Sequence, residues 1–541
     1  MKKKFIIIPL LVIILIFIFY GTAFYQQKKI HYNNVILITL DTLRQDVLGC
    51  YGNVTVKTPV LDELAQQGIL FKNAYCNVPS TLPSHASMLF SETPWNLKVF
   101  RNGNIIDNLT FALPKYMKKA GFQTAAFTSL GVVESYFGLS QGFDYYFDVS
   151  HNQSRSYLFA DEVNKEVFKW LSSHYQKSFF AWIHYSDPHE PYIPKYAPPD
   201  VELTFNDNVI ARYNFIINEF NTINLSLKPG NNTLTFNGLR KTSSPSKKLQ
   251  AEYFLEKFML KDPSCKAYPA GSYEKRDTVI QFTTSLTMVI ENPSQQTINT
   301  QIIFRGNATQ NLPEAKRHYY DEVEYLDKEL GNLINWLKAY NSYQNTLILI
   351  IADHGEGLGN HNIMGHENHL YFAQIKIPFI IIDHSHKAKV IESLVSPMDL
   401  APTISSYLHL KPDKNWRGNP VQPLLSKMNG YSPERKYLES ATFFAKSNEP
   451  SYIFHKFSIV TKTHHLIYSL NQNKYELYNV SDKKEIFNLA RYSLYPEDYD
   501  KLLSRLQHLE MQAEKQILTY RKTPLPPHMI EQLKSLGYLN P

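Results

Sequence analysis

Three short runs of apolar residues along the chain each end in polar residues that can carry chemistry. They are NVILIT (34–39), SFFAWIH (178–184) and TLILIIA (346–352). Continuous apolar runs of this length are typical of strands that are buried on both faces of a parallel sheet. Ligands of such sheets bind beyond the carboxyl ends of the strands. We therefore expect the three polar clusters to converge in space, although they lie far apart in the sequence.

Helical patterns separate these runs. They predict helices at about 59–68, 157–174 and 315–340. Strands that alternate with helices indicate an α/β fold. At 541 residues the chain is too long for one small domain, so further units are expected.

One long stretch, 201–313, departs from this alternation. It contains alternating segments such as NNTLTFNG and DTVIQFTTSLTMVIE, with turn signals at 229–232 and at Asn292-Pro293. This pattern predicts an inserted all-β module, a small sandwich. The alternative is a set of extra strands that extend the main sheet. After about residue 430, further strands and a helical tail near 495–520 predict a small α+β subdomain.

These patterns divide the chain into five parts. The expected parts are an N-terminal membrane or signal segment (1–28), a first catalytic part (32–200), the β-rich insert (201–313), a second catalytic part (314–430) and a C-terminal subdomain with a helical tail (431–541).

The N-terminal segment is apolar from Phe5 to Phe24 and follows Lys2, Lys3 and Lys4. About 20 apolar residues can span a bilayer. The segment is longer than the apolar region of an ordinary cleaved signal peptide, so a retained anchor is favoured over a secreted protein. In both cases the lysines stay in the cytoplasm and the catalytic part lies outside it, in the periplasm or the extracellular space.

Charge and cysteine content add little to this picture. The formal net charge is +7, but the basic residues are scattered, which favours an anionic substrate and gives no basis for nucleic-acid binding. Cys50, Cys76 and Cys265 lack the spacing of a metal site. Either Cys50 pairs with Cys76, or all three are free thiols.

The polar clusters contain a candidate metal site. Asp41 follows the first apolar run, and Asp353 and His354 follow the last. Two carboxylates and an imidazole suit a divalent cation. Taken singly, an Asp after a strand is more often a helix cap or a turn residue.

Thr81, in VPSTLPSHASMLF, favours a functional site over a set of turn residues. It precedes an apolar helical pattern, so that Thr81 or Ser80 could serve only as a helix cap. A metal and a helix N-terminus beside the Thr81 hydroxyl would instead make it a nucleophile.

Several motifs in this order resemble the sulfatase family of the alkaline phosphatase superfamily. They are NVILITLDTLRQDVLGCYGN, TLPSHASML, FAWIHYSDPHEPY, IADHGEGLGNHNIMGHENHLYFAQIKIPFIII, SPMDLAPTISSYLHL, YELYNVSDKKEIFNLA and LKSLGYL. The resemblance covers nearly the whole chain except the N-terminal segment and the insert. It implies an α/β fold with a mixed sheet sandwiched by helices, and a metal-dependent ester hydrolase of class EC 3.1.

Four positions differ from the usual sulfatase pattern. Thr42 stands where a second Asp is common, and His85 replaces the signature Arg. Thr81 stands where sulfatases form formylglycine from Cys or Ser, an aldehyde that Thr cannot give. His354 replaces an Asn. The set resembles phosphate-handling relatives that use a Thr or Ser nucleophile with Zn or Mn.

The resemblance also assigns supporting roles. The metal ligands are Asp41, Thr81, Asp353 and His354, and a second ion would lie among Asp187, His189 and His366. One or two divalent ions, Zn, Mn or Ca, are expected. His189, with His184, contacts the anion or protonates the leaving group. The candidate substrate-binding residues are His85, His366 and Arg44, although Arg44 fits a surface ion pair equally well.

The implied reaction is attack by Thr81 on phosphorus or sulfur, followed by release of the covalent intermediate. Phosphodiesters and phosphomonoesters are favoured over sulfate esters, with a glycan or a lipid headgroup as the carrier of the ester. The alternatives are a true sulfuric ester hydrolase, an envelope phosphoglycerol or phosphoethanolamine transferase, and an inactive glycan-binding protein.

Overall fold

The computed structural model describes residues 32–538 with internal gaps. The residues left out within this range are 152–155, 191, 193, 196–199, 214–219, 240–252, 271–272, 277–278, 284, 309–311, 426–434, 446–452, 521–523 and 536–537. The predicted N-terminal membrane segment lies outside the described residues and stays a prediction. Among the helices that are described, none combines the length and the hydropathy that a bilayer crossing requires.

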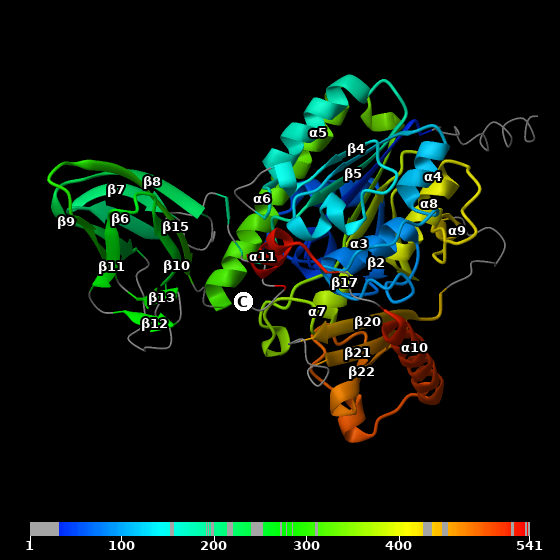
Figure 1. The fold of residues 1–541 in the computed structure, drawn as a ribbon. Helices are drawn as coiled ribbons and strands as arrows, with labels where there is room; N and C mark the ends of the chain where they lie inside the picture. Colours follow the sequence, from blue (N-terminus) through cyan, green and yellow to red (C-terminus); the bar gives the residue numbers. More distant parts are fainter. Residues whose placement is uncertain are drawn as a thin grey trace, which may run out of the picture.

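A mixed sheet forms the centre of the α/β part, as expected (Figure 1). Its strand order is β17 (Lys376–Ile377), β2 (Ile69–Tyr75), β18 (Phe379–Ile382), β16 (Thr346–Ala352), β1 (Asn34–Leu40), β5 (Phe179–Tyr185), β3 (Gln123–Phe127) and β4 (Tyr145–Phe147), and β19 (Lys389–Val395) also pairs with β2. The strands from β16 to β4 are parallel, whereas β18 runs antiparallel to β16 and β2. The three apolar runs are therefore adjacent strands.

The register of these three strands aligns their carboxyl ends. Leu40 at the end of β1 lies level with Ala352 of β16 on one side and with Tyr185 of β5 on the other. Every residue of β1, β5 and β16 is buried, as continuous apolar runs predict. The next residues along β1 and β16, Asp41 and Asp353, consequently emerge side by side.

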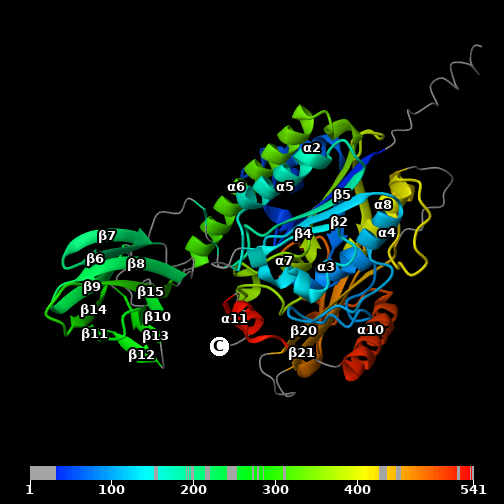
Figure 2. The same cartoon turned by 45° about the horizontal axis from the view of Figure 1, so that its top comes forward.

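Helices cover both faces of the sheet. One group comprises α2 (Pro59–Gln67), α5 (Ala160–His174) and α6 (Leu312–Ala339), and the other comprises α3 (Thr81–Phe90), α4 (Leu113–Lys119) and α8 (Leu400–Tyr407). Figure 2 shows the two groups on opposite sides of the sheet. The helix predicted from residue 157 begins only at Ala160, because Tyr157 forms a β-bridge with Leu130 and the Phe159 N–H donates to the Glu162 carboxylate.

The insert forms two five-stranded antiparallel sheets (Figure 1). One has the order β12 (Glu274–Arg276), β13 (Val279–Phe282), β10 (Tyr253–Leu260), β15 (Ile298–Ala308) and β8 (Phe220–Leu227). The other has β11 (Lys266–Ala270), β14 (Ser285–Asn292), β9 (Gly230–Gly238), β6 (Val201–Phe205) and β7 (Asn208–Tyr213). They share an apolar core of their own, so these strands do not extend the main sheet. The following helix, α6, begins at Leu312, slightly before the predicted boundary.

The C-terminal part adds a four-stranded antiparallel sheet and two helices. The strands are β20 (Leu438–Ala445), β21 (Ile453–Val460), β22 (His464–Ser469) and β23 (Lys474–Asn479). Helix α10 (Tyr499–Thr519) packs on this sheet through Leu502, Leu506 and Leu509. A last helix, α11 (Pro527–Ser535), is not predicted by the sequence pattern, and it returns to the main core. The three cysteines are free thiols.

Candidate active site and metal centre

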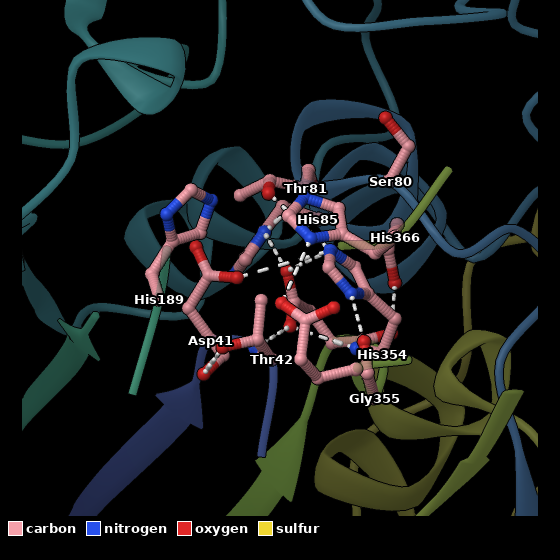
Figure 3. Close-up of polar contacts among 12 residues, drawn as sticks. Asp41, Thr42, Ser80, Thr81, His85, His189, His354, Gly355 and His366 are labelled. Carbon is pink, nitrogen blue, oxygen red and sulfur yellow. Dashed lines mark hydrogen bonds and ion pairs between the residues drawn. The ribbon is translucent and has the colours of Figure 1, made fainter. Parts of the chain in front are cut away.

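The ends of β1 and β16 place two carboxylates and an imidazole next to one another (Figure 3). Asp41, Asp353 and His354 are each fully buried. One potential ligand atom from each residue lies within 4.8 Å of the other two. Among the described residues, this is the one group of three acidic, His or Cys side chains with such a geometry.

The orientation of His354 leaves one ring nitrogen available to a ligand. Its Nδ1 lies 2.9 Å from the carbonyl oxygen of Gly355 and donates to it. The Nε2 lone pair therefore points toward the carboxylates, 3.4 Å from Asp353 Oδ2 and 3.8 Å from Asp41 Oδ1. A backbone carbonyl that fixes the tautomer in this way is a common feature of metal-binding histidines.

The carboxylate oxygens that face His354 lack hydrogen-bond donors. Asp353 Oδ1 accepts from the backbone N–H groups of Thr42, at 3.1 Å, and of His354, at 2.7 Å. Asp353 Oδ2 and Asp41 Oδ1 have no hydrogen bond within the described part of the chain. A buried carboxylate oxygen without a partner is costly. A divalent cation would satisfy both oxygens, so this donor set fits a metal ion.

Thr42 does not contribute its side chain to this group. Its hydroxyl donates to the Pro188 carbonyl at 2.7 Å, and its φ is +55°, in the left-handed region that β-branched residues rarely adopt. This conformation aims the Thr42 N–H at Asp353. The strained backbone marks a constrained position next to Asp41.

Thr81 is the first residue of α3 and is fully buried at the site. Its Oγ1 lies 3.3 Å from His354 Nε2, the same nitrogen that faces the carboxylates. Ser80 occupies the N-cap position, but its hydroxyl donates to the Glu367 carboxylate at 2.6 Å. Neither hydroxyl caps the helix, so the alternative that Thr81 or Ser80 serves only as a helix cap is not supported.

The surroundings shift the pKa values of the two aspartates in opposite directions. Burial raises the pKa of Asp41, but a hydrogen bond from His184 and the nearby His189 outweigh it and hold this pKa well below its usual range. Burial raises the pKa of Asp353 well above its usual range, and the Asp41 charge raises it further. Two carboxylates in one buried site oppose each other's ionisation, and a cation would relieve that repulsion.

His85 and His184 are buried next to the site, and both ring nitrogens of each imidazole lie close to polar atoms of the protein. His85 Nδ1 is 2.8 Å from the Thr81 carbonyl oxygen and 3.6 Å from Asp353 Oδ2, and its Nε2 is 3.1 Å from Thr39 Oγ1. Burial lowers the pKa of His85 to about 3. His184 Nε2 lies 3.3 Å from Asp41 Oδ2, and its Nδ1 accepts from Ser129. Both imidazoles therefore brace the predicted ligands and the nucleophile.

His189 and His366 lie next to each other at the rim of the site, defined as the residues around Thr81 on the side away from the sheet. Their ring centroids are 5.0 Å apart. The His366 ring also lies 4.6 Å from that of His354. Burial lowers the pKa of His189. Burial also lowers the pKa of His366, but the Glu356 carboxylate beside it prevails and raises this pKa to about 9. The surroundings thus shift the pKa values of the two imidazoles in opposite directions.

Sequence reasoning missed a third member of the rim. Tyr538, in the terminal LKSLGYL motif, places its hydroxyl 2.5 Å from His189 Nε2 and 3.4 Å from His366 Nε2. The sequence marks this motif only through the family resemblance. Nothing in its composition indicates contact with residues about 350 and 170 positions earlier.

Two other predicted site residues form hydrogen bonds with groups outside the metal site. The Arg44 guanidinium binds Asp46 and the backbone carbonyls of Glu356 and Gly357. Asp187 Oδ1 accepts from the Ala160 N–H, at the start of α5. The predicted second metal set, which includes Asp187, is not among the groups whose ligand atoms come together in the described residues.

The comparison with protein families agrees with this geometry. The sequence model of the family described as "Sulfatase" matches residues 33–410. The chain belongs to the sulfatase family. It is accordingly a sulfatase-family ester hydrolase. The matched region contains the candidate metal ligands and Thr81, and it ends before the C-terminal sheet.

Curated relatives of this sulfatase-family chain match over most of their length. An arylsulfatase of Clostridium perfringens is 23% identical over 484 residues, which cover 87% of this chain and 92% of the relative. An N-acetylglucosamine-6-O-sulfatase of Bacteroides thetaiotaomicron is 21% identical, with 90% and 88% covered.

Solved structures show the same fold. A protein in complex with its substrate D-glucosamine-2-N,6-O-disulfate has a TM-score of 0.62 at 17% identity, with 90% of this chain and 98% of that chain covered. The phosphonate monoester hydrolase of Agrobacterium radiobacter has a TM-score of 0.57 at 17% identity, with 89% and 96% covered. At these identities the likeness concerns the fold alone.

Proposed function

We propose that this enzyme hydrolyses phosphate esters, diesters and monoesters ahead of sulfate esters, with Thr81 as its nucleophile. The observation that carries the proposal is the position of Thr81. Its hydroxyl lies 3.3 Å from His354 Nε2, and that nitrogen faces the unpaired oxygens of Asp41 and Asp353.

Asp41, Asp353 and His354 would hold a divalent cation, with the Thr81 oxygen beside it. Such an ion supplies charge stabilisation and lowers the pKa of a bound hydroxyl. The imidazole favours Zn or Mn over Ca, which prefers oxygen ligands alone. One ion fits the ligand set that the described residues bring together.

The residues of the chain then divide the reaction between them. The Thr81 hydroxyl gives up its proton to solvent, and its oxygen forms a bond to phosphorus while the bond between phosphorus and the leaving oxygen breaks. His366 neutralises the charge on the anion, and His189, once it has taken up a proton on Nε2, hands that proton to the leaving oxygen. Water next attacks the same phosphorus atom and breaks its bond to Thr81, which regains its proton. His85 and His184 keep the nucleophile and Asp41 in place.

The chemistry of the nucleophile favours phosphate. In sulfatases an aldehyde hydrate attacks sulfur and then expels sulfate by elimination. Thr81 carries no second hydroxyl for such an elimination, so a sulfated Thr81 would have to be cleared by direct attack of water. A phosphorylated Thr is cleared in that way in the phosphatase relatives, where a metal stabilises the charge.

Sulfate esters are the second candidate substrate, and the relatives favour them. The curated relatives above are named as an arylsulfatase and an N-acetylglucosamine-6-O-sulfatase. The similar structure with a bound sulfated glucosamine supports a carbohydrate as the carrier of the ester. The phosphonate monoester hydrolase supports a phosphorus centre on the same fold.

Matched nitrophenyl esters decide between these substrates. We would measure kcat/KM for the sulfate, the phosphate monoester and a phosphodiester after loading the enzyme with Zn, Mn or Ca. A preference for a phosphorus ester that disappears in Thr81→Ala supports the proposal. A preference for the sulfate ester that disappears in the same variant overturns the phosphate assignment. Metal binding without turnover of any ester would indicate a binding protein.

The location of the enzyme is a separate proposal that rests on the sequence. Lys2, Lys3 and Lys4 precede the apolar segment from Phe5 to Phe24, so the catalytic part is placed outside the cytoplasm with the segment as its anchor. A C-terminal reporter that is active only in the cytosol should give no signal. A strong signal from that reporter would contradict this topology.

A further inference from the structure

The C-terminal helix α11 fixes the position of Tyr538. Met529 and Leu533 of α11 are buried in the main core rather than in the core under α10. The Tyr538 N–H donates to the Leu533 carbonyl oxygen at 2.9 Å, directly after the helix. In Figure 1, α11 lies against the α/β part, apart from α10. Helix α11 and Tyr538 are therefore attached to the catalytic part of the molecule.

The hydrogen bonds around Tyr538 have a defined direction. His189 Nδ1 lies 2.5 Å from the Glu190 carbonyl oxygen and donates to it. In the neutral ring the remaining nitrogen, Nε2, accepts the hydroxyl proton of Tyr538 at 2.5 Å, and in the protonated ring that acts as the acid it donates to the Tyr538 oxygen instead. The Tyr538 oxygen is then free to accept from His366 Nε2 at 3.4 Å, while His366 Nδ1 pairs with Glu356.

This single hydroxyl connects the two rim histidines. The His189 and His366 rings are nearly perpendicular, at 72°, and no direct hydrogen bond joins them among the described residues. The Glu190 carbonyl and the Glu356 carboxylate each bind one nitrogen of these rings, so the angle between the rings depends on a group that binds the remaining nitrogen of both. Tyr538 is that group, and it comes from the opposite end of the chain.

We propose that Tyr538 is a positioning residue for the reaction at Thr81. Its hydroxyl holds the rings of His189 and His366 in their orientation relative to each other. The inference rests on the proposed function, because it concerns the proton that His189 hands to the leaving oxygen. It predicts that the hydroxyl matters most when the leaving group needs that proton.

The ring of Tyr538 has a second, separable role in packing. It lines the small pocket next to Ser80, together with Arg101 and Phe443. Tyr538→Phe retains this ring and removes only the hydroxyl. The variant therefore separates the contact with the histidines from the packing of the chain end.

The test compares two esters in Tyr538→Phe. Phenyl and 4-nitrophenyl esters of the acid that the wild-type enzyme prefers differ in how much the leaving group needs a proton. Because general acid catalysis contributes about 10²–10⁴-fold, we expect kcat for the phenyl ester to fall by about tenfold or more. The 4-nitrophenyl ester should change little, and KM should change little for both.

Tyr520→Phe is the matched control. The Tyr520 hydroxyl also accepts a hydrogen bond, from Asn104 at 2.8 Å, but it contacts neither rim histidine. This variant should leave both esters unchanged. The melting temperature and the metal content of both variants show whether the fold and the metal site are intact.

A double variant tests whether Tyr538 acts through His189. In a His189→Ala background the added Tyr538→Phe change should have almost no further effect, because interacting residues are not additive. Fully additive losses, or equal losses on both esters in Tyr538→Phe, would overturn the inference. Wild-type rates in Tyr538→Phe would also overturn it while the proposed function stands. Absence of wild-type turnover on every ester would instead refute the proposed function.

Discussion

The α/β part and the inserted β-sandwich use buried space in opposite ways. The sandwich fills its core with apolar side chains such as Leu234, Phe236 and Phe304. At the strand ends of the α/β part and at the start of α3, fully buried positions carry Asp41, His354 and Thr81. Among the described residues of the sandwich, no group of acidic, His or Cys side chains comes together as a metal site.

The sandwich core therefore contributes to stability, whereas the buried polar residues of the α/β part serve function at a cost in stability. Burying an apolar side chain stabilises the fold, whereas burying a carboxylate without a partner costs free energy. The unpaired oxygens of Asp41 and Asp353 therefore weaken the α/β part unless a cation binds there. Changes at the strand ends should alter catalysis and metal binding, and changes in the sandwich should not alter the chemical step.

The largest expected effect is that of Thr81→Ala. Loss of the nucleophile should lower kcat by about 10³-fold or more, with the fold and most of the metal retained. Steady-state rates and metal analysis of the same preparation measure both. Thr403→Ala is the control, because Thr403 is a buried threonine of α8 whose hydroxyl accepts from the Val421 N–H. Undiminished turnover in Thr81→Ala would end the nucleophile assignment.

Asp353→Asn should separate metal binding from fold stability. The variant loses a charged ligand, so its metal content and activity should fall sharply. Without metal it should melt at a higher temperature than the wild type at neutral pH, because the chain no longer has to bury and protonate the Asp353 carboxyl, whose ionisation Asp41 opposes. Added metal should raise the melting temperature of the wild type much more than that of the variant. A metal-free variant that melts lower than the metal-free wild type would contradict this account.

Removal of the sandwich should have the smallest effect on the chemical step. A variant in which a short linker replaces 201–308 should keep its activity on a small nitrophenyl ester, because the two cores are separate. Its activity on a larger, carbohydrate-linked ester should change if the sandwich contributes to substrate choice. Circular dichroism and rates on both esters measure this. A deletion variant that is unfolded would show that the sandwich supports the main core.

The strand ends are predictable from the sequence for a physical reason. Continuous apolar runs indicate buried parallel strands, and adjacent parallel strands end at one edge of the sheet. The apolar runs alone are therefore enough to group Asp41, Asp353 and His354. The alternating pattern of the insert predicts the sandwich in the same way. It does not predict where the sandwich ends, because α6 begins at Leu312, within the predicted module.

The rim of the site cannot be derived in this way. Tyr538 reaches His189 across almost 350 residues, and its position depends on how α11 packs against the main core. The substrate-binding role expected for His85 stays a prediction. Its two hydrogen bonds, to the Thr81 carbonyl and to Thr39, are visible only in the folded chain. Contacts of this kind depend on tertiary packing rather than on local patterns.

The most direct test of the central claim is to identify the residue that carries the covalent intermediate. Rapid acid quenching during turnover of a fast-leaving phosphorus ester, followed by mass spectrometry of the peptides, locates the transferred group. One phosphoryl group is expected on the peptide that contains Thr81, and it should be absent from Thr81→Ala and from enzyme depleted of metal. A phosphorylated histidine or another phosphorylated residue, with Thr81 unmodified during active turnover, would contradict the central claim.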